Sequence, residues 1–243
     1  MDPYINALID HLSGFVTKNR LELFQQVIAE RTRYITVLLE DIYQSQNASA
    51  VLRTCDCLGI QDAHIVEESN EYEVNPDISL GSNQWLNVHY YDKSGENSGK
   101  AHNRKPSKKG GKNILYAVET LRERGYRIVA TSPNLKGSTP ETFNLEKGKA
   151  VIMFGTELNG LTERALRLAD EFIRVPMVGF TESFNISVSA AVILYSIRKR
   201  LVESSIAWRI SEEEKGSILL DWLRNSIRMS AEIERKFRTE WES

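Results

Sequence analysis

Short β-rich apolar runs alternate along this chain with amphipathic segments, and this alternation constrains the fold more than any other feature. Strands are predicted at residues 34–40, 63–67, 85–91, 126–131, 149–154 and 171–176. Apolar residues at helical spacing predict helices between them, at residues 47–59, 113–125, 162–170 and 185–201. Strands that alternate with helices form a parallel sheet with helices on both faces, so we expect an α/β fold.

Both ends of the chain carry helical patterns without strands. Two helices are predicted near the N-terminus, at residues 3–12 and 19–32, and one long helix from about 211 to 240. We therefore expect an N-terminal helical extension, a core and a C-terminal helical extension, at residues 1–33, 34–201 and 202–243. Within the core, Asn47 can cap the start of its helix and Gly59 can terminate it.

Composition excludes several classes of protein. The 243 residues are 41% hydrophobic and 26% charged, which is typical of globular domains and not of a disordered chain. No apolar stretch approaches the roughly 20 residues of a membrane span, and the first residues do not resemble a signal peptide. Cys55 and Cys57 are too close for an ordinary disulfide, and no Cys/His cluster completes a zinc site. We expect a cytoplasmic protein whose two cysteines pack in its interior and which needs no metal.

Positive charge gathers in two places. Residues 93–112 contain seven Lys or Arg and one Glu among Gly, Ser and Asn, which predicts a surface loop. This basic loop is either a solubilising insertion or a flexible arm that contacts phosphates, through residues such as Lys105, Lys108 and Lys109. Arg198 and Arg200 form a second basic cluster at the end of a predicted helix, where positive charge also favours the helix dipole.

Three segments follow predicted strands at the edge where α/β sheets bind ligands. The first, NASAVLRTCDCLG (47–59), contains Asn47 and Arg53, and the second is FGTELNGLT (154–162). The third is VPMVGFTESFNIS (175–187). Each has an ordinary structural explanation when taken alone: Arg53 as a solvated side chain, and Asn47, Glu157, Ser183 and Asn185 as caps of helices or turns.

Taken together, the three segments resemble the motifs of the SpoU family of the SPOUT class of RNA 2′-O-methyltransferases. They stand in the family's order at similar spacing, and the resemblance spans about residues 34–201. It is strongest to the bacterial methyltransferases of guanosine 18 in tRNA, which also carry helical extensions at both ends. The resemblance implies a SPOUT fold with a C-terminal deep trefoil knot and a homodimer.

The resemblance also implies S-adenosylmethionine as the methyl donor. The residues implied to contact it are Thr131, Gly155, Thr156, Glu157, Gly160, Val175, Pro176, Met177, Phe184 and Asn185. Phe184 stands where the family usually has leucine, and Thr156 where asparagine or alanine is common. These two departures leave the exact shape of the cofactor pocket open.

The implied reaction transfers a methyl group to a ribose 2′-hydroxyl. The motif-one arginine, here Arg53, would bind an RNA phosphate and orient the hydroxyl, because a guanidinium group keeps its proton. Asn47 would orient Arg53 or the ribose, and Ser183 and Asn185 would hold the target nucleotide. The residues expected to contact RNA are Arg53, Arg198, Arg200, Lys105, Lys108 and Lys109.

Other functions stay open at this point. The substrate could be ribosomal RNA, or the chain could be a non-catalytic RNA-binding protein of the same fold. A nucleotide-dependent enzyme of Rossmann type is disfavoured, because the chain lacks the glycine fingerprint of that fold.

Overall fold

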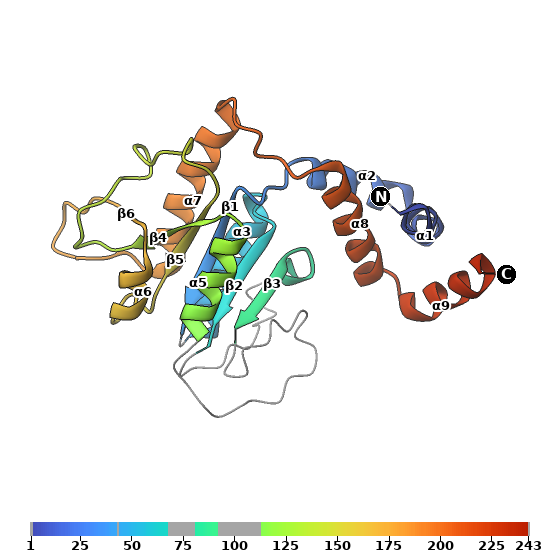
Figure 1. Cartoon of the computed structure of the whole chain (residues 1–243), viewed down its shortest axis with the longest axis horizontal. Helices are drawn as coiled ribbons and strands as arrows, with labels where there is room; N and C mark the ends of the chain where they lie inside the picture. The colour runs from blue at the N-terminus through green and yellow to red at the C-terminus, as the bar shows by residue number, and fades with distance from the viewer. Residues whose placement is uncertain (1, 43, 68–80, 92–112, 243) are drawn as a thin grey trace. The chain divides into compact units, whose positions relative to one another are not determined.

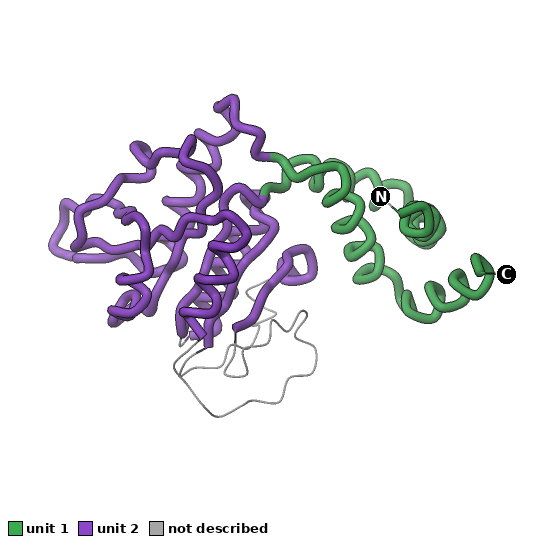
Figure 2. Tube along the Cα trace, in the orientation of Figure 1, with its two compact units in different colours: residues 1–32, 209–243 green, residues 33–208 purple. Residues whose placement is uncertain are grey.

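A computed structural model describes residues 2–42, 44–67, 81–91 and 113–242. The basic loop 93–112, with Lys105, Lys108 and Lys109, lies outside the described residues. The chain divides into two compact units, one made of residues 1–32 and 209–243 and the other of residues 33–208 (Figure 2). Residues 202–208, which the sequence analysis assigned to the C-terminal extension, thus belong to the larger unit.

In the described part of the larger unit, one six-stranded sheet forms the core (Figure 1). Its strands are β1 (Ile35–Glu40), β2 (Asp62–Val66), β3 (Asn87–Tyr91), β4 (Arg127–Thr131), β5 (Ala150–Phe154) and β6 (Glu171–Ile173). They lie in the order β3-β2-β1-β5-β4-β6, and every neighbouring pair is parallel. The parallel α/β fold predicted from the alternating pattern is therefore confirmed.

Helices cover both faces of this sheet. On one face α3 (Ser45–Cys57) and α7 (Ile186–Glu203) pack against inward residues such as Val37 and Leu39 of β1. On the other face α5 (Asn113–Glu123) and α6 (Glu163–Leu168) pack against Leu38. All six residues of β1 are buried, as expected for a central strand that has helices on both sides. A short 3₁₀ helix, η1 (Ser82–Gln84), precedes β3.

The predicted helix ends are partly confirmed. Gly59 and Gly125 adopt positive φ angles of 72° and 81° just beyond α3 and α5, where only glycine is free of steric cost. The prediction that Asn47 caps α3 is wrong, because the helix begins at Ser45 and Asn47 lies inside its first turn. Asn185 does cap α7, since its side-chain oxygen accepts the Ser187 N–H at 2.8 Å.

Strand β6 lies between two segments that precede it in the chain. One is β4, and the other is the connection from β4 to β5, whose Ser138 pairs in parallel with Ile173. The Ser138 N–H donates to the Phe172 carbonyl at 3.0 Å, and the Arg174 N–H donates to Ser138 at 2.9 Å. Strand β6 is therefore paired on both sides with parts of the chain that precede it.

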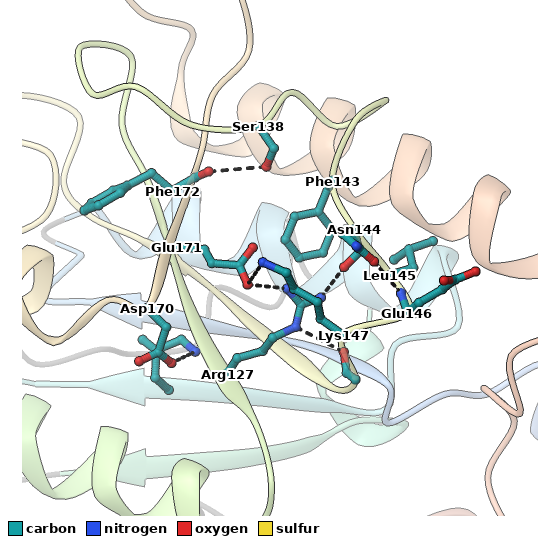
Figure 3. Close-up of polar contacts among 12 residues, drawn as sticks. Arg127, Ser138, Phe143, Asn144, Leu145, Glu146, Lys147, Asp170, Glu171 and Phe172 are labelled. Carbon is teal, nitrogen blue, oxygen red and sulfur yellow. Dashed lines mark hydrogen bonds and ion pairs between the residues drawn. The ribbon is translucent and has the colours of Figure 1, made fainter.

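A polar network fixes the amino ends of these strands (Figure 3). Arg127 of β4 forms a 2.7 Å ion pair with Glu171 of β6, and Lys147 reaches the same carboxylate at 3.2 Å. The guanidinium of Arg127 also lies 4.6 Å from the ring centroid of Phe143, which is fully buried. The β4–β5 connection is thus held to β4 and β6.

The smaller unit is made of the two end segments of the chain. Its helices in the described residues are α1 (Pro3–Ser13), α2 (Lys18–Ala29), α8 (Glu212–Ser226) and α9 (Ser230–Trp241), around a core that includes Leu8, Phe24 and Trp222. The prediction of one helix over 211–240 is wrong, because the chain turns at Met229, whose φ is +61°. Among the described residues, no helix is both long and apolar enough to cross a membrane.

Candidate functional site

A cavity of about 440 Å³ opens at the carboxyl ends of β4, β5 and β6. This edge of a parallel sheet is where α/β proteins bind ligands, because the loops that follow the strands converge there. The predicted site residues that line the cavity are Thr131, Gly155, Thr156, Glu157, Gly160, Val175, Met177, Ser183 and Phe184. Pro176 and Asn185 are not among the lining residues, although both neighbour residues that are.

The loop of residues 155–161 forms one wall of this cavity, and its shape is fixed by bonds within itself. The backbone of Thr156 exchanges two hydrogen bonds with Gly160, at 3.0 and 2.9 Å, and the Thr156 hydroxyl accepts the Asn159 N–H. A Cβ atom at residue 155 would lie 2.1 Å from the carbonyl carbon of Gly160. Glycine is therefore required at 155 because the two ends of the loop touch there.

Residues of the three motif segments meet beside the cavity. The side-chain amide of Asn185, at the start of α7, donates to Asn47 Oδ1 on α3 at 3.2 Å. The same amide nitrogen donates to the carboxylate of Glu157 in the loop after β5. Asn47 lies 138 positions before Asn185 in the sequence, so only the fold brings these side chains together.

Arg53 lies on α3, six residues and thus about 1.7 helical turns beyond Asn47, and is exposed. Its guanidinium group is thus accessible from solvent, as the proposed contact with RNA requires. Arg198 and Arg200 are engaged inside the protein instead. Arg198 donates to the Leu58 carbonyl at 3.1 Å and lies 3.9 Å from the Trp208 ring centroid, and Arg200 donates to the carbonyls of Pro140 and Phe143.

The sequence analysis missed part of the cavity. Residues 132–135, directly after Thr131 at the end of β4, line it together with Arg174 and Glu182. Only their position in the sequence could have indicated residues 132–135, because they follow a buried parallel strand, as the other loops that line the cavity do. The prediction that both cysteines pack in the interior is wrong for Cys57, which is exposed, while Cys55 is buried.

The strongest electrostatic perturbations lie on β2 and β3, across β1 from the cavity. Burial, with the nearby charge of His89, lowers the pKa of His64 to about 3, and its Nδ1 lies 3.1 Å from the Tyr91 hydroxyl. Burial also raises the pKa of Tyr91 to about 12. His64 and Tyr91 are buried in the sheet and lie away from the cavity, so their role is structural. No group of three or more His, Cys, Asp or Glu in the described ranges is placed to hold a metal ion.

Comparison with known proteins places this arrangement in a family. Residues 34–195 match the model of the SpoU rRNA Methylase family. The chain belongs to the SpoU family. The matched residues include all three motif segments, so the resemblance predicted from them is confirmed.

Relatives of this SpoU family member extend over nearly its whole length. The tRNA (guanosine(18)-2′-O)-methyltransferase of Borreliella burgdorferi is 40% identical over 94% of this chain and 95% of its own length. The enzyme of the same name from Thermus thermophilus is 31% identical over 86% of this chain and 97% of its own length.

Solved structures share the fold. The TrmH/SpoU tRNA modifying enzyme of A. aeolicus superposes with a TM-score of 0.71 at 25% identity, covering 87% of this chain and 98% of its own. The SpoU methyltransferase AviRb of Streptomyces viridochromogenes, solved in complex with the cofactor AdoMet, superposes with a TM-score of 0.53 at 20% identity. That match covers 74% of this chain and 62% of AviRb, and it supports the fold alone.

Proposed function

We propose that this chain is an S-adenosylmethionine-dependent tRNA (guanosine(18)-2′-O)-methyltransferase that acts in the cytoplasm. The observation that carries the proposal is the meeting of Asn47, Glu157 and Asn185, one from each motif segment, beside one cavity. The relatives named for this activity match 94% and 86% of this chain. This extent favours tRNA over ribosomal RNA as the substrate.

The cavity fits S-adenosylmethionine in size and in chemistry. A volume of about 440 Å³ lies within the range of pockets that hold cofactors and other small molecules. Its walls combine apolar side chains, such as Leu161 and Phe184, with hydroxyl groups and loop backbone that can bond to a nucleoside and an amino acid. AviRb, which shares the fold, holds AdoMet. Bound S-adenosylmethionine would supply an electrophilic methyl group.

The residues around the cavity then have separable roles. Asn185, held by Asn47 and Glu157, orients the ribose beside the cavity, and Ser183 lines the same wall. Arg53 binds an RNA phosphate and fixes the 2′-hydroxyl in line with the methyl group, because positioning can supply much of the rate of such a transfer. The hydroxyl loses its proton to an RNA phosphate or to water.

We also propose that the protein acts as a homodimer. One face of α7 is buried in the core, whereas its outer face exposes Val188, Val192, Tyr195 and Val202 at positions i, i+4, i+7 and i+14. These four side chains are between 38% and 62% exposed. An apolar stripe at this spacing on a long helix is suited to packing against a second copy.

The trefoil knot implied by the family resemblance is a further part of the proposal. It is supported by the position of β6 between β4 and Ser138 of the β4–β5 connection. Threading a strand through an earlier loop is very rare in proteins. It is expected to slow refolding, because the later segment must pass through a loop that has already formed. Stretching the chain from its two ends should leave it shorter than its full contour length if it is knotted.

The activity is tested by mapping ribose methylation in RNA from cells with and without the gene. Loss of 2′-O-methylguanosine at tRNA position 18 in the deletion strain, restored by the intact gene, is the expected result. The purified protein should methylate a tRNA transcript and spare a transcript with adenosine at position 18. A modification that disappears from ribosomal RNA instead would identify the alternative substrate. No lost modification, with no binding of S-adenosylmethionine, would favour a non-catalytic RNA-binding protein.

A further inference from the structure

We propose that Glu40 is a positioning residue that holds the loop 155–161 where it can form the cofactor cavity. The inference rests on the proposed binding of S-adenosylmethionine to that cavity. Glu40 is the last residue of β1, and no motif segment contains it. Its role emerges only from contacts that cross from one strand end to another.

The Glu40 carboxylate reaches the end of the loop directly. Its Oε2 accepts the backbone N–H of Thr162 at 2.8 Å, and its Oε1 accepts the Thr162 hydroxyl at 2.7 Å. The two residues are 122 positions apart in the sequence, and Glu40 is only 1% exposed. Two hydrogen bonds to one buried carboxylate define both the distance and the direction of Thr162 from β1.

The contact with Glu40 adds to the hydrogen bonds within the loop. The bonds between Thr156 and Gly160 fix the loop's shape but not its place above the sheet. At its start the loop continues from Phe154, which pairs with Leu39 in the sheet. At its end it is held by Glu40, the residue after Leu39. Both ends of the loop are therefore held at the carboxyl end of β1.

The local structure around Thr162 does not require the Glu40 carboxylate. The Thr162 hydroxyl already caps α6 by accepting the Ala165 N–H at 3.2 Å, and this cap does not require Glu40. Burying a carboxylate is costly unless hydrogen bonds compensate for lost hydration. A buried carboxylate at this junction is explained if the exact position of the loop matters for the cavity, as it would for a bound cofactor.

Three substitutions separate positioning from general stability. Glu40→Gln keeps the side-chain shape but leaves one acceptor oxygen for the two donors of Thr162. Thr162→Val removes the hydroxyl, and with it both the bond to Glu40 and the cap of α6, whereas Thr162→Ser retains both. The matched control is Thr36→Val, which removes another buried hydroxyl of β1, one that donates to the Asp62 carbonyl at 2.6 Å, away from the loop.

The test measures the Kd for S-adenosylmethionine by calorimetry, together with kcat and KM for methyl transfer. Glu40→Gln should raise the Kd by about 10-fold or more, and Thr162→Val by about 3- to 10-fold, because bonds to a buried charge are lost. Thr162→Ser and Thr36→Val should change the Kd by less than about twofold. At saturating cofactor, kcat should stay within about threefold of wild type, since none of the residues proposed to act on the RNA is changed.

The outcomes distinguish this inference from the proposed function. Wild-type protein that does not bind S-adenosylmethionine would overturn the proposed function itself. Wild-type binding with an unchanged Kd in Glu40→Gln and Thr162→Val would overturn only the positioning role, as would an equal loss of affinity in Thr36→Val. If Glu40→Gln does not fold, the comparison of Thr162→Val with Thr36→Val decides the question in the same way, once the two proteins are shown to have the same thermal stability despite the lost cap of α6.

Discussion

Arg53 is an exposed side chain on α3, the helix that also carries Asn47, whereas Asn47, Glu157 and Asn185 are bonded to one another. It comes from the helix after β1, whereas the cavity is formed by the loops after β4, β5 and β6. A substitution of Arg53 should therefore affect the reaction of the RNA and leave the binding of the cofactor unchanged.

We expect Arg53→Ala to reduce methyl transfer to tRNA by at least about 100-fold while the Kd for S-adenosylmethionine changes by less than about twofold. Arg53→Lys should recover only part of the activity, because lysine keeps the charge but not the planar pair of donors. Single-turnover assays and calorimetry on the same preparations provide the two measurements. A loss of cofactor affinity equal to the loss of activity would contradict this separation.

His64 has a predictable effect on stability. Its pKa is about 3 in the folded protein, against 6.5 for the unperturbed side chain, so between pH 7 and pH 5 the unfolded chain takes up a proton that the native state does not. The contribution of His64 to the unfolding free energy should therefore fall by about 2 kcal/mol over this interval as the pH is lowered.

The measurement is urea denaturation of wild type and His64→Gln at pH 7 and pH 5. Glutamine does not titrate, so the variant should lose about 2 kcal/mol less than wild type between the two pH values. The variant can be less stable overall, because a buried contact with Tyr91 changes, but only the difference between pH values tests the prediction. Equal losses in both proteins would show that His64 does not cause the pH dependence.

At the scale of elements, the break between α8 and α9 depends on one residue in an unfavourable conformation. Met229 has φ +61° and ψ 31°, in the left-handed region that favours glycine, and its side chain is 63% exposed. A residue with a Cβ atom is strained there by about 1 kcal/mol or more.

Met229→Gly should accordingly stabilise the helical unit by up to about 1 kcal/mol, because the strain relieved exceeds the small packing that an exposed methionine contributes. Met229→Ala keeps the Cβ atom and serves as the control, with little or no gain expected. Thermal unfolding of the three proteins measures the effect. A glycine variant less stable than the alanine variant would mean that the turn is not strained.

The sheet elements illustrate how separate contacts maintain an unusual connection. Arg127 and Lys147 both hold Glu171, and Ser138 pairs with β6 (Figure 3). The ion pairs lie at the start of β6, whereas Ser138 pairs with Ile173 at its carboxyl end. Residues 132–135 of the same connection line the cavity, so the segment that supports the proposed knot also forms part of the ligand site.

At the scale of the whole molecule, the proposed dimer can be disrupted at the outer stripe of α7. Tyr195 is 62% exposed in the single chain, so Tyr195→Asp should leave folding intact while it places a charge in the apolar contact. Light scattering should give twice the 27.7 kDa chain mass for wild type and a mass near 27.7 kDa for the variant at micromolar concentration.

Leu115→Asp is the matched control, because Leu115 is a comparably exposed apolar residue on α5, on the opposite face of the sheet. It should leave the dimer unchanged. A wild-type protein that is monomeric at micromolar concentration would contradict the proposed dimer. A Tyr195→Asp dimer would place the contact on another surface.

Much of the fold and part of the site could be predicted from the sequence because they depend on local patterns. Apolar runs and helical periodicity identified the strands and helices around the sheet, and Gly59 and Gly125 marked helix ends through a conformation that other residues adopt at a cost. The three segments were recognisable because loops after parallel strands meet at one edge. What this sequence determined alone was therefore the class of fold, its family and the loops that carry the site.

Contacts between distant parts of the chain were decided only by the tertiary structure. No local pattern indicates that Asn47 bonds to Asn185 or that Glu40 holds Thr162, because each pair is separated by more than a hundred residues. In the sequence Asn47 resembles a helix cap and Arg198 a surface cation. In the folded protein Asn47 lies inside α3 and bonds to Asn185, and Arg198 bonds to the Leu58 carbonyl. The order of the strands, with β6 paired between β4 and Ser138, likewise depends on how the whole sheet buries its apolar residues, and periodicity within a segment carries no information about it.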